Sequence, residues 1–131
     1  MGIHHVGVAV ADLDEAVGTY ERLFAGRVEH RERLDADGVE VATIRIGESR
    51  VELMASLGSD TPVGRFLARR GPGMHHIAYE VADVRSALAE LAAAGVELVD
   101  LEPRRGMQGL EVAFVRPESV HGVLSEVVAR V

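Results

Sequence analysis

The chain has 131 residues, 47% of them hydrophobic, so it can bury one core but is too short for two ordinary independent domains. Its 21 acidic residues outnumber 14 basic ones, and the resulting formal charge of −7 argues against nucleic acid as the main partner. The absence of cysteine excludes disulfides, thiolate metal ligands and a cysteine nucleophile. Because neither a basic leader nor a long apolar run is present, we expect no membrane partner and a cytoplasmic location.

The first half of the chain predicts the order β-α-β-β-β. Residues 3–10 suit a strand in which the side chains of His4 and His5 point to opposite faces. Asp12 predicts the start of a short helix, because apolar residues follow it at helical spacing as far as Gly26. The remaining segments that read as strands are residues 27–34, 39–46 and 49–54.

The second half repeats this plan after a connector at residues 57–73, in which Pro62 opens a short predicted helix. Residues 74–81 predict a strand, and Asp83 predicts the start of an alanine-rich helix that ends at Gly95. Three more strands are expected at about residues 96–101, 109–115 and 122–128.

These elements predict one α+β domain spanning residues 1–131. Module one covers about residues 1–56 and module two about residues 74–131. One helix cannot cover the apolar face of a four-stranded module by itself, so the two modules are expected to form a curled mixed sheet around a metal-binding cleft.

The histidines carry an internal repeat. Shifting the second half back by 71 positions places His75 on His4 and His76 on His5. Since His5 and His76 occupy the same phase of a repeated strand, both are candidate metal ligands. Their neighbours His4 and His75 point the other way. The histidines without a repeat partner are expected to be structural or surface residues: His30 and His121.

Each module also places one glutamate in the apolar strand that ends it, Glu52 in the first and Glu126 in the second. A glutamate is seldom fully buried without a partner, so each is solvent-exposed on an edge strand, paired with a cation, or bound to metal. Two histidines and two glutamates form a donor set that suits a divalent ion such as Mn, Co, Ni, Zn or Fe. Such a site leaves room for water or substrate.

Five stretches resemble the vicinal oxygen chelate superfamily, which includes glyoxalases, bleomycin resistance proteins and dioxygenases, and within it the methylmalonyl-CoA epimerase family. The resemblance implies that the metal ligands are His5, Glu52, His76 and Glu126. It also implies an isomerase that epimerises methylmalonyl-CoA or a similar acyl-CoA thioester by proton transfer through a metal-stabilised enolate, and a homodimer. The stretches are residues 3–10, 62–67, 71–78, 102–106 and 121–126.

The chain departs from the epimerase pattern at one proton-transfer position. Family members carry an acid followed by Gln-Gly at the start of the third strand, where this chain has Ala36, Asp37 and a glycine. Alanine cannot transfer a proton, so either Asp35 or Asp37 takes the role beside Glu126, or that base has been lost.

The same resemblance implies a binding site for coenzyme A. Arg104 and Arg105 lie in an epimerase-like stretch and are expected to contact the phosphates of the coenzyme.

A lactoylglutathione lyase uses much the same ligand pattern and is the second enzyme hypothesis. An extradiol dioxygenase is disfavoured by Glu52, since it usually has a single glutamate ligand. A ligand-sequestering protein without catalysis is favoured by Ala36 and disfavoured by the four intact ligand positions.

Overall fold

The structure is a computed structural model that describes residues 2–130. These residues form three α-helices and eight strands in two successive β-α-β-β-β runs, joined by the second helix. The α+β class, the mixed strand pairing and the two-module plan predicted from the sequence are therefore confirmed. Packing divides the described residues into an N-terminal unit, residues 5–75, and a C-terminal unit, residues 76–130 with residues 2–4. The predicted domain limits at Met1 and Val131 lie outside the described residues.

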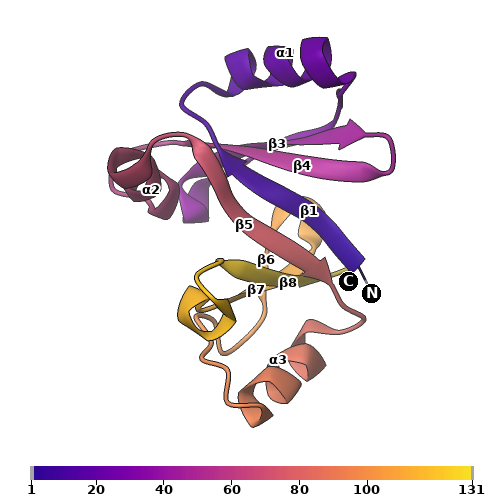
Figure 1. The fold of residues 1–131 in the computed structure, drawn as a ribbon, viewed down its shortest axis with the longest axis vertical. Helices are drawn as coiled ribbons and strands as arrows, with labels where there is room; N and C mark the ends of the chain where they lie inside the picture. Colours follow the sequence, from indigo (N-terminus) through magenta and orange to yellow (C-terminus); the bar gives the residue numbers. More distant parts are fainter. Residues whose placement is uncertain (1, 131) are drawn as a thin grey trace. The chain divides into compact units, whose positions relative to one another are not determined.

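The N-terminal unit is built on strands in the order β2-β3-β4-β1 (Figure 1). β1 pairs with β4 in parallel, and the other neighbours pair antiparallel. The strands lie close to the predicted limits, and the 3-10 turn η1 lies between β2 and β3. Their bounds are β1 Gly2–Ala9, α1 Leu13–Phe24, β2 Arg27–Leu34, η1 Asp35–Asp37, β3 Val39–Ile46, β4 Ser49–Ser56 and α2 Pro62–Arg70.

Both helices of this unit begin at side chains that cap them. The carboxylate of Asp12 accepts the backbone N–H of Glu15 at 2.9 Å, as the sequence pattern predicts for an N-cap. The hydroxyl of Thr61 does the same for Gly64 at 2.9 Å, and Pro62 fills the first turn of α2, where its missing N–H costs nothing. The capping residues Asp12 and Thr61 therefore determine where the two helices start.

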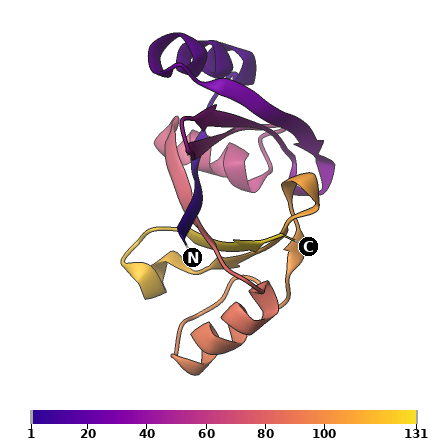
Figure 2. The ribbon, with the colours of Figure 1, turned by 90° about the vertical axis from the view of Figure 1, so that its right-hand side faces the viewer.

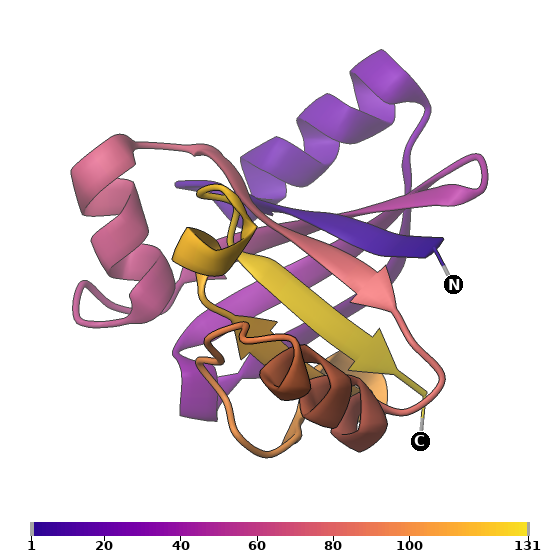
Figure 3. The ribbon, with the colours of Figure 1, turned by 60° about the horizontal axis from the view of Figure 1, so that its bottom comes forward.

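Helix α1 covers one face of the N-terminal sheet, here called the helix face (Figure 3). Leu13 and Val17 pack there against Ala42, Ile44 and Leu53, and all five side chains are buried. Because successive strand residues point to opposite faces, the residues that alternate with these lie on the other side, here called the far face.

The C-terminal unit has strands in the order β5-β8-β7-β6, with β5 and β8 parallel and the other neighbours antiparallel. Helix α3 lies along β7 and β8 (Figure 2), where Val84 and Leu88 pack on Ala113 and Val127. No helix within residues 2–130 is long and apolar enough to cross a bilayer. The bounds are β5 Gly73–Glu80, α3 Val84–Ala93, β6 Arg104–Arg105, η2 Met107–Gly109, β7 Glu111–Val115, η3 Pro117–Val120 and β8 Ser125–Ala129.

The prediction of a strand at residues 96–101 is wrong. That segment makes one isolated bridge, between Leu98 and Val115, and the strand beside β7 is instead the two-residue β6. The pairing breaks because the N–H groups of Val99 and Asp100 share one acceptor, the carbonyl of Phe114, while an Asp100 side-chain oxygen accepts the N–H of Phe114. The side chain thus occupies a position that a backbone carbonyl fills in a regular ladder.

Candidate active site

The N-terminal unit brings His5 and Glu52 together on the far face. Gly7 is the strand partner of Glu52 in the parallel pair of β1 and β4, and His5 precedes Gly7 by two residues on the same side of β1. The two side chains meet with Nε2 of His5 3.3 Å from Oε2 of Glu52, and their side chains are 4% and 13% exposed. The first predicted histidine–glutamate pair is therefore present.

The C-terminal unit builds the same pair from the same register. Ala78 is the strand partner of Glu126 in the parallel pair of β5 and β8, and His76 precedes Ala78 by two residues. Nε2 of His76 lies 3.7 Å from Oε1 of Glu126, and both side chains are buried. The sequence repeat thus corresponds to a repeat in three dimensions, with one imidazole and one carboxylate in each unit.

The donor chemistry of both pairs fits a divalent metal ion. Two ligands of one ion, each about 2.1 Å from it, lie roughly 3 Å apart, close to the separations found within the two pairs. A carboxylate on a buried strand is costly unless a cation or hydrogen-bond donors compensate its charge. Glu126 is only 6% exposed and lies between Ser125 and Val127, so its position fits a metal ligand better than a solvent-facing edge residue.

Residues opposite the glutamates differ between the units. Thr43, which is buried, is the antiparallel partner of Glu52 on β3, whereas Phe114 is the partner of Glu126 on β7. The ring of Phe114 meets His76 edge-on, with centroids 5.5 Å apart and planes at 85°. This contact restricts the rotation of the imidazole and so helps to hold His76 in one orientation.

Phe114 is itself held by two residues, Asp100 and Arg104. Oδ2 of Asp100 accepts the Phe114 N–H at 2.9 Å, and Oδ1 lies 3.1 Å from Nε of Arg104. The guanidinium of Arg104 lies over the Phe114 ring, 5.7 Å from its centroid. Asp100 belongs to a segment predicted as a strand, so no sequence signal pointed to this role.

The predicted aspartate bases lie on η1, at the end of the β2–β3 hairpin. Asp35 is 78% exposed and pairs with Arg33 at 3.2 Å. Val39, the first residue of β3 after η1, is four residues from Thr43, about 13 Å at the spacing of strand residues. The structure therefore places this turn well along the strand from Glu52, and a catalytic role for Asp35 or Asp37 stays a prediction.

The second histidines of each repeat fall on the other side of their strands. His75 packs edge-on against Phe66 of α2, with ring centroids 4.9 Å apart. Burial there lowers the pKa of His75, which favours the neutral imidazole. His75 thus has a packing role, as the alternation of the strand predicts.

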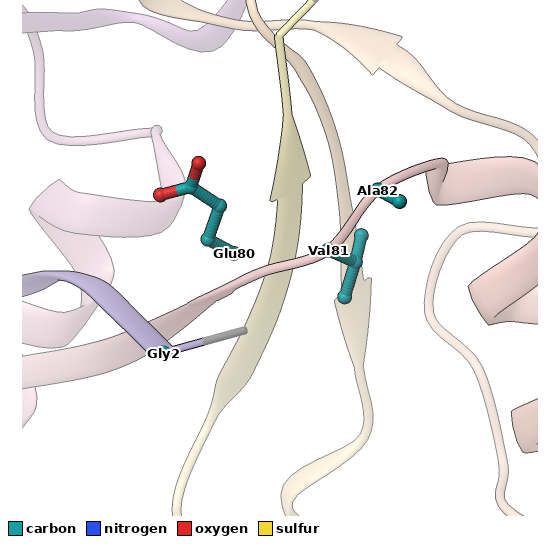
Figure 4. Close-up of a pocket in the computed structure, with 4 residues that line it drawn as sticks. All are labelled: Gly2, Glu80, Val81 and Ala82. Carbon is teal, nitrogen blue, oxygen red and sulfur yellow. The ribbon is translucent and has the colours of Figure 1, made fainter.

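A hollow of about 500 Å³ lies in the C-terminal unit (Figure 4). It is lined by Gly2, Glu80, Val81 and Ala82, at the end of β5 where the chain turns toward α3. Glu80 is the only titratable residue among these four. The hollow therefore includes neither His76 nor Glu126, and its lining offers no acid–base pair.

Comparison with known proteins assigns the chain to a family. Residues 4–114 match the family described as Glyoxalase/Bleomycin resistance protein/Dioxygenase superfamily. The ethylmalonyl-CoA/methylmalonyl-CoA epimerase of Cereibacter sphaeroides is 33% identical over 126 residues, which cover 95% of this chain and 94% of that protein.

Solved structures agree. A methylmalonyl-CoA epimerase in complex with methylmalonyl-CoA and NH4+ has a TM-score of 0.95 at 36% identity, covering 98% of this chain and 94% of that one. A variant of the Streptomyces coelicolor methylmalonyl-CoA epimerase in complex with 2-nitronate-propionyl-CoA has a TM-score of 0.96 at 36% identity, covering 99% and 94%. The chain belongs to the glyoxalase/bleomycin resistance protein/dioxygenase superfamily, and methylmalonyl-CoA epimerases are among its homologues.

Proposed function

We propose that this protein epimerises methylmalonyl-CoA, or an acyl-CoA thioester with the same malonyl group, at the carbon between the thioester and the carboxylate. The observation that carries the proposal is the matched pair of buried histidine and glutamate in each unit, His5 with Glu52 and His76 with Glu126. Relatives described as epimerases, and complexes of such relatives with acyl-CoA ligands, support the same reaction.

The two pairs together hold one divalent metal ion in this proposal. Four nitrogen and oxygen donors suit Co, Mn, Ni, Zn or Fe, and the chain has no cysteine that would select a thiophilic ion. When bound, such an ion supplies a Lewis acid that stabilises negative charge on the oxygens of the substrate.

Epimerisation also needs groups that move a proton on each face of the α-carbon. Glu126 is our candidate for one face, because its carboxylate is buried beside His76 and, as a proposed metal ligand, would lie next to the bound substrate. The C–H bond breaks, its electron pair stays on the substrate as an enolate, and a second group delivers a proton to the opposite face. Asp35 and Asp37 are the candidates from sequence for that second group.

The coenzyme A part of the substrate would bind near β6. Arg104 and Arg105 are both exposed, and 41% of the Arg104 side chain is accessible beside Asp100. Guanidinium groups bind phosphate well, and this chain needs local basic groups because its net charge is negative. We also propose that the protein is a homodimer and is located in the cytoplasm.

Solvent exchange tests the reaction. Protein stripped with EDTA and reloaded with Co(II) is incubated with each epimer of methylmalonyl-CoA in D2O, and the α-proton is followed by NMR. We expect loss of the α-proton signal and formation of the other epimer, whereas propionyl-CoA, which lacks the carboxylate, should exchange far more slowly.

Two outcomes would replace this function. If Co(II) binds but neither epimer exchanges, while the hemithioacetal of methylglyoxal and glutathione is converted, the protein is a lactoylglutathione lyase. If no metal binds after incubation with Co(II) or Mn(II), the protein is instead a ligand-sequestering member of the superfamily. Metal content is measured on the same samples, so the outcomes are separated.

A further inference from the structure

A row of side chains crosses the far face of the N-terminal sheet. Gly7 pairs with Glu52, Glu52 pairs with Thr43, and Thr43 pairs with His30 on the edge strand β2. Directly paired residues project to the same face of a sheet. His30 is therefore on the same face as Glu52 and two strands from it, about 10 Å away at the usual spacing of strands.

The assignment of His30 to the far face has an independent check. Its neighbour Arg31 must point to the opposite face, and Arg31 does form an ion pair of 2.7 Å with Asp14, a residue of α1. Since α1 covers the helix face, His30 points away from it. From the sequence alone, His30 is expected to be a structural or surface residue, because it has no counterpart in the repeat.

His30 forms an oriented acid–base pair with Glu32. Nε2 of His30 lies 2.8 Å from Oε1 of Glu32, two residues along the same face of β2. Their side chains are 31% and 32% exposed, so a substrate or water can reach them. A carboxylate that accepts the Nε2 proton fixes the tautomer in which Nδ1 carries a lone pair and can accept a proton.

We propose that His30, oriented by Glu32, is the second proton-transfer residue and replaces the acid that is missing at Ala36. The inference rests on the proposed epimerisation. A substrate that extends from Glu52 across Thr43 would approach His30 along this row.

Two residues, His30 and Glu126, exchange protons with the substrate in this step. Nδ1 of neutral His30 takes the proton from the α-carbon, the electrons of the broken C–H bond stay on the substrate as the enolate, and the carboxyl of Glu126, which starts protonated, donates its proton to the opposite face. In the reverse direction, the Glu126 carboxylate takes the proton and the His30 imidazolium donates one. Exchange of either group with water resets the protein.

Asp35 is a poorer candidate for this step. Asp35 is 78% exposed and is paired with Arg33, so nothing orients its carboxylate toward the far face. His30, by contrast, is oriented by Glu32 and lies in the same row as Glu52.

The test compares His30→Gln with the unaltered protein and with Arg31→Gln, a neighbouring change on the helix face. Each Co(II)-loaded protein is given the two epimers of methylmalonyl-CoA separately in D2O. For His30→Gln we expect epimerisation to slow at least 100-fold, the usual range for loss of a general acid or base. Deuterium should still enter one epimer, because Glu126 can remove and return a proton on its own face. Arg31→Gln should retain activity within about threefold.

Epimerisation within threefold of the unaltered protein, with exchange into both epimers, would overturn the role of His30. So would one-sided exchange in Asp37→Asn together with normal behaviour of His30→Gln. His30→Asn provides a second variant, and Co(II) affinity and circular dichroism report folding of each. If the unaltered protein exchanges into neither epimer, the proposed function fails and this inference with it, a result distinct from failure of His30 alone.

Discussion

Asp100 binds the backbone N–H of Phe114 through one carboxylate oxygen at 2.9 Å and Arg104 through the other at 3.1 Å. One side chain thereby fixes both the backbone of the strand residue opposite Glu126 and the cation above its ring. Because the Phe114 ring contacts His76, this link connects the surface strand β6 with a proposed metal ligand. The two adjacent arginines of β6 should therefore have different functions.

Arg104→Gln and Arg105→Gln should separate these functions. Loss of Arg105, whose expected role is phosphate binding, should raise KM for methylmalonyl-CoA with little change in kcat, since it would remove binding that is equal in the ground and transition states. Loss of Arg104 frees the Phe114 ring and Asp100, so kcat should fall as well. Steady-state kinetics with both variants measures the split, and equal effects on kcat and KM in both would contradict distinct roles.

Glu52→Ala and Glu126→Ala should each weaken Co(II) binding at least tenfold, because each removes one of four proposed ligands. Glu52→Gln keeps an oxygen donor without the charge and should weaken binding less. Glu80→Gln is the control, since Glu80 belongs to neither pair. Isothermal titration of EDTA-treated protein measures the affinities, and an unchanged affinity in either alanine variant would remove that residue from the site.

Much of the fold follows from local sequence. Asp12 and Asp83 cap their helices as the spacing predicts, and the phase of residues 3–10 correctly puts the buried side chain of His5 opposite that of His4. Both histidine–glutamate pairs could be anticipated because the chain repeats its first strand, and a repeated strand repeats its register. The resemblance to a superfamily of metal enzymes added the prediction that these four residues are metal ligands.

The features that could not be predicted depend on contacts that a periodic sequence pattern does not indicate. The segment at residues 96–101 has enough apolar residues for a strand, but Asp100 uses its side chain where a ladder needs a carbonyl, so the pairing becomes irregular. The pairing of His30 with Glu32 and its alignment with Glu52 depend on the register of β2 on β3, which has an irregularity between Val28 and His30. A bulge of this kind shifts register and is not readable from alternation alone.

Glu29 should make stability depend on acidic pH. A hydrogen bond from Arg50, aided by the charges of Arg50 and Arg45, lowers the pKa of Glu29 below its ordinary value of 4.5. A carboxyl with a lower pKa in the folded state stabilises the fold above its unfolded pKa, and this contribution is lost as pH falls through the folded pKa. Glu29→Gln should therefore lower the free energy of unfolding at pH 7 by at most about 1 kcal/mol and not at all at the acid limit.

The measurement for Glu29 is urea unfolding at several pH values between about 2 and 7, on EDTA-treated protein so that metal binding does not contribute. Glu21→Gln is the control, since Glu21 is exposed on α1. The difference between Glu29→Gln and the unaltered protein should shrink as pH falls. A difference that stays constant across this range would mean that the charge of Glu29 is not what stabilises the fold.

Metal removal should lower the thermal stability of the protein. His5, His76 and Glu126 are all less than 10% exposed, so the fold keeps these polar groups out of water, and a bound cation would offset part of that cost. A ligand that binds only the folded state stabilises it by RT ln(1 + [L]/Kd), about 2.7 kcal/mol at 100 times Kd. Calorimetry with and without Co(II) should show a Tm that rises with Co(II) concentration in the unaltered protein and much less in Glu126→Ala. Ca(II), which prefers oxygen ligands, should produce little rise. A Tm that is insensitive to every divalent ion tested would contradict the metal site.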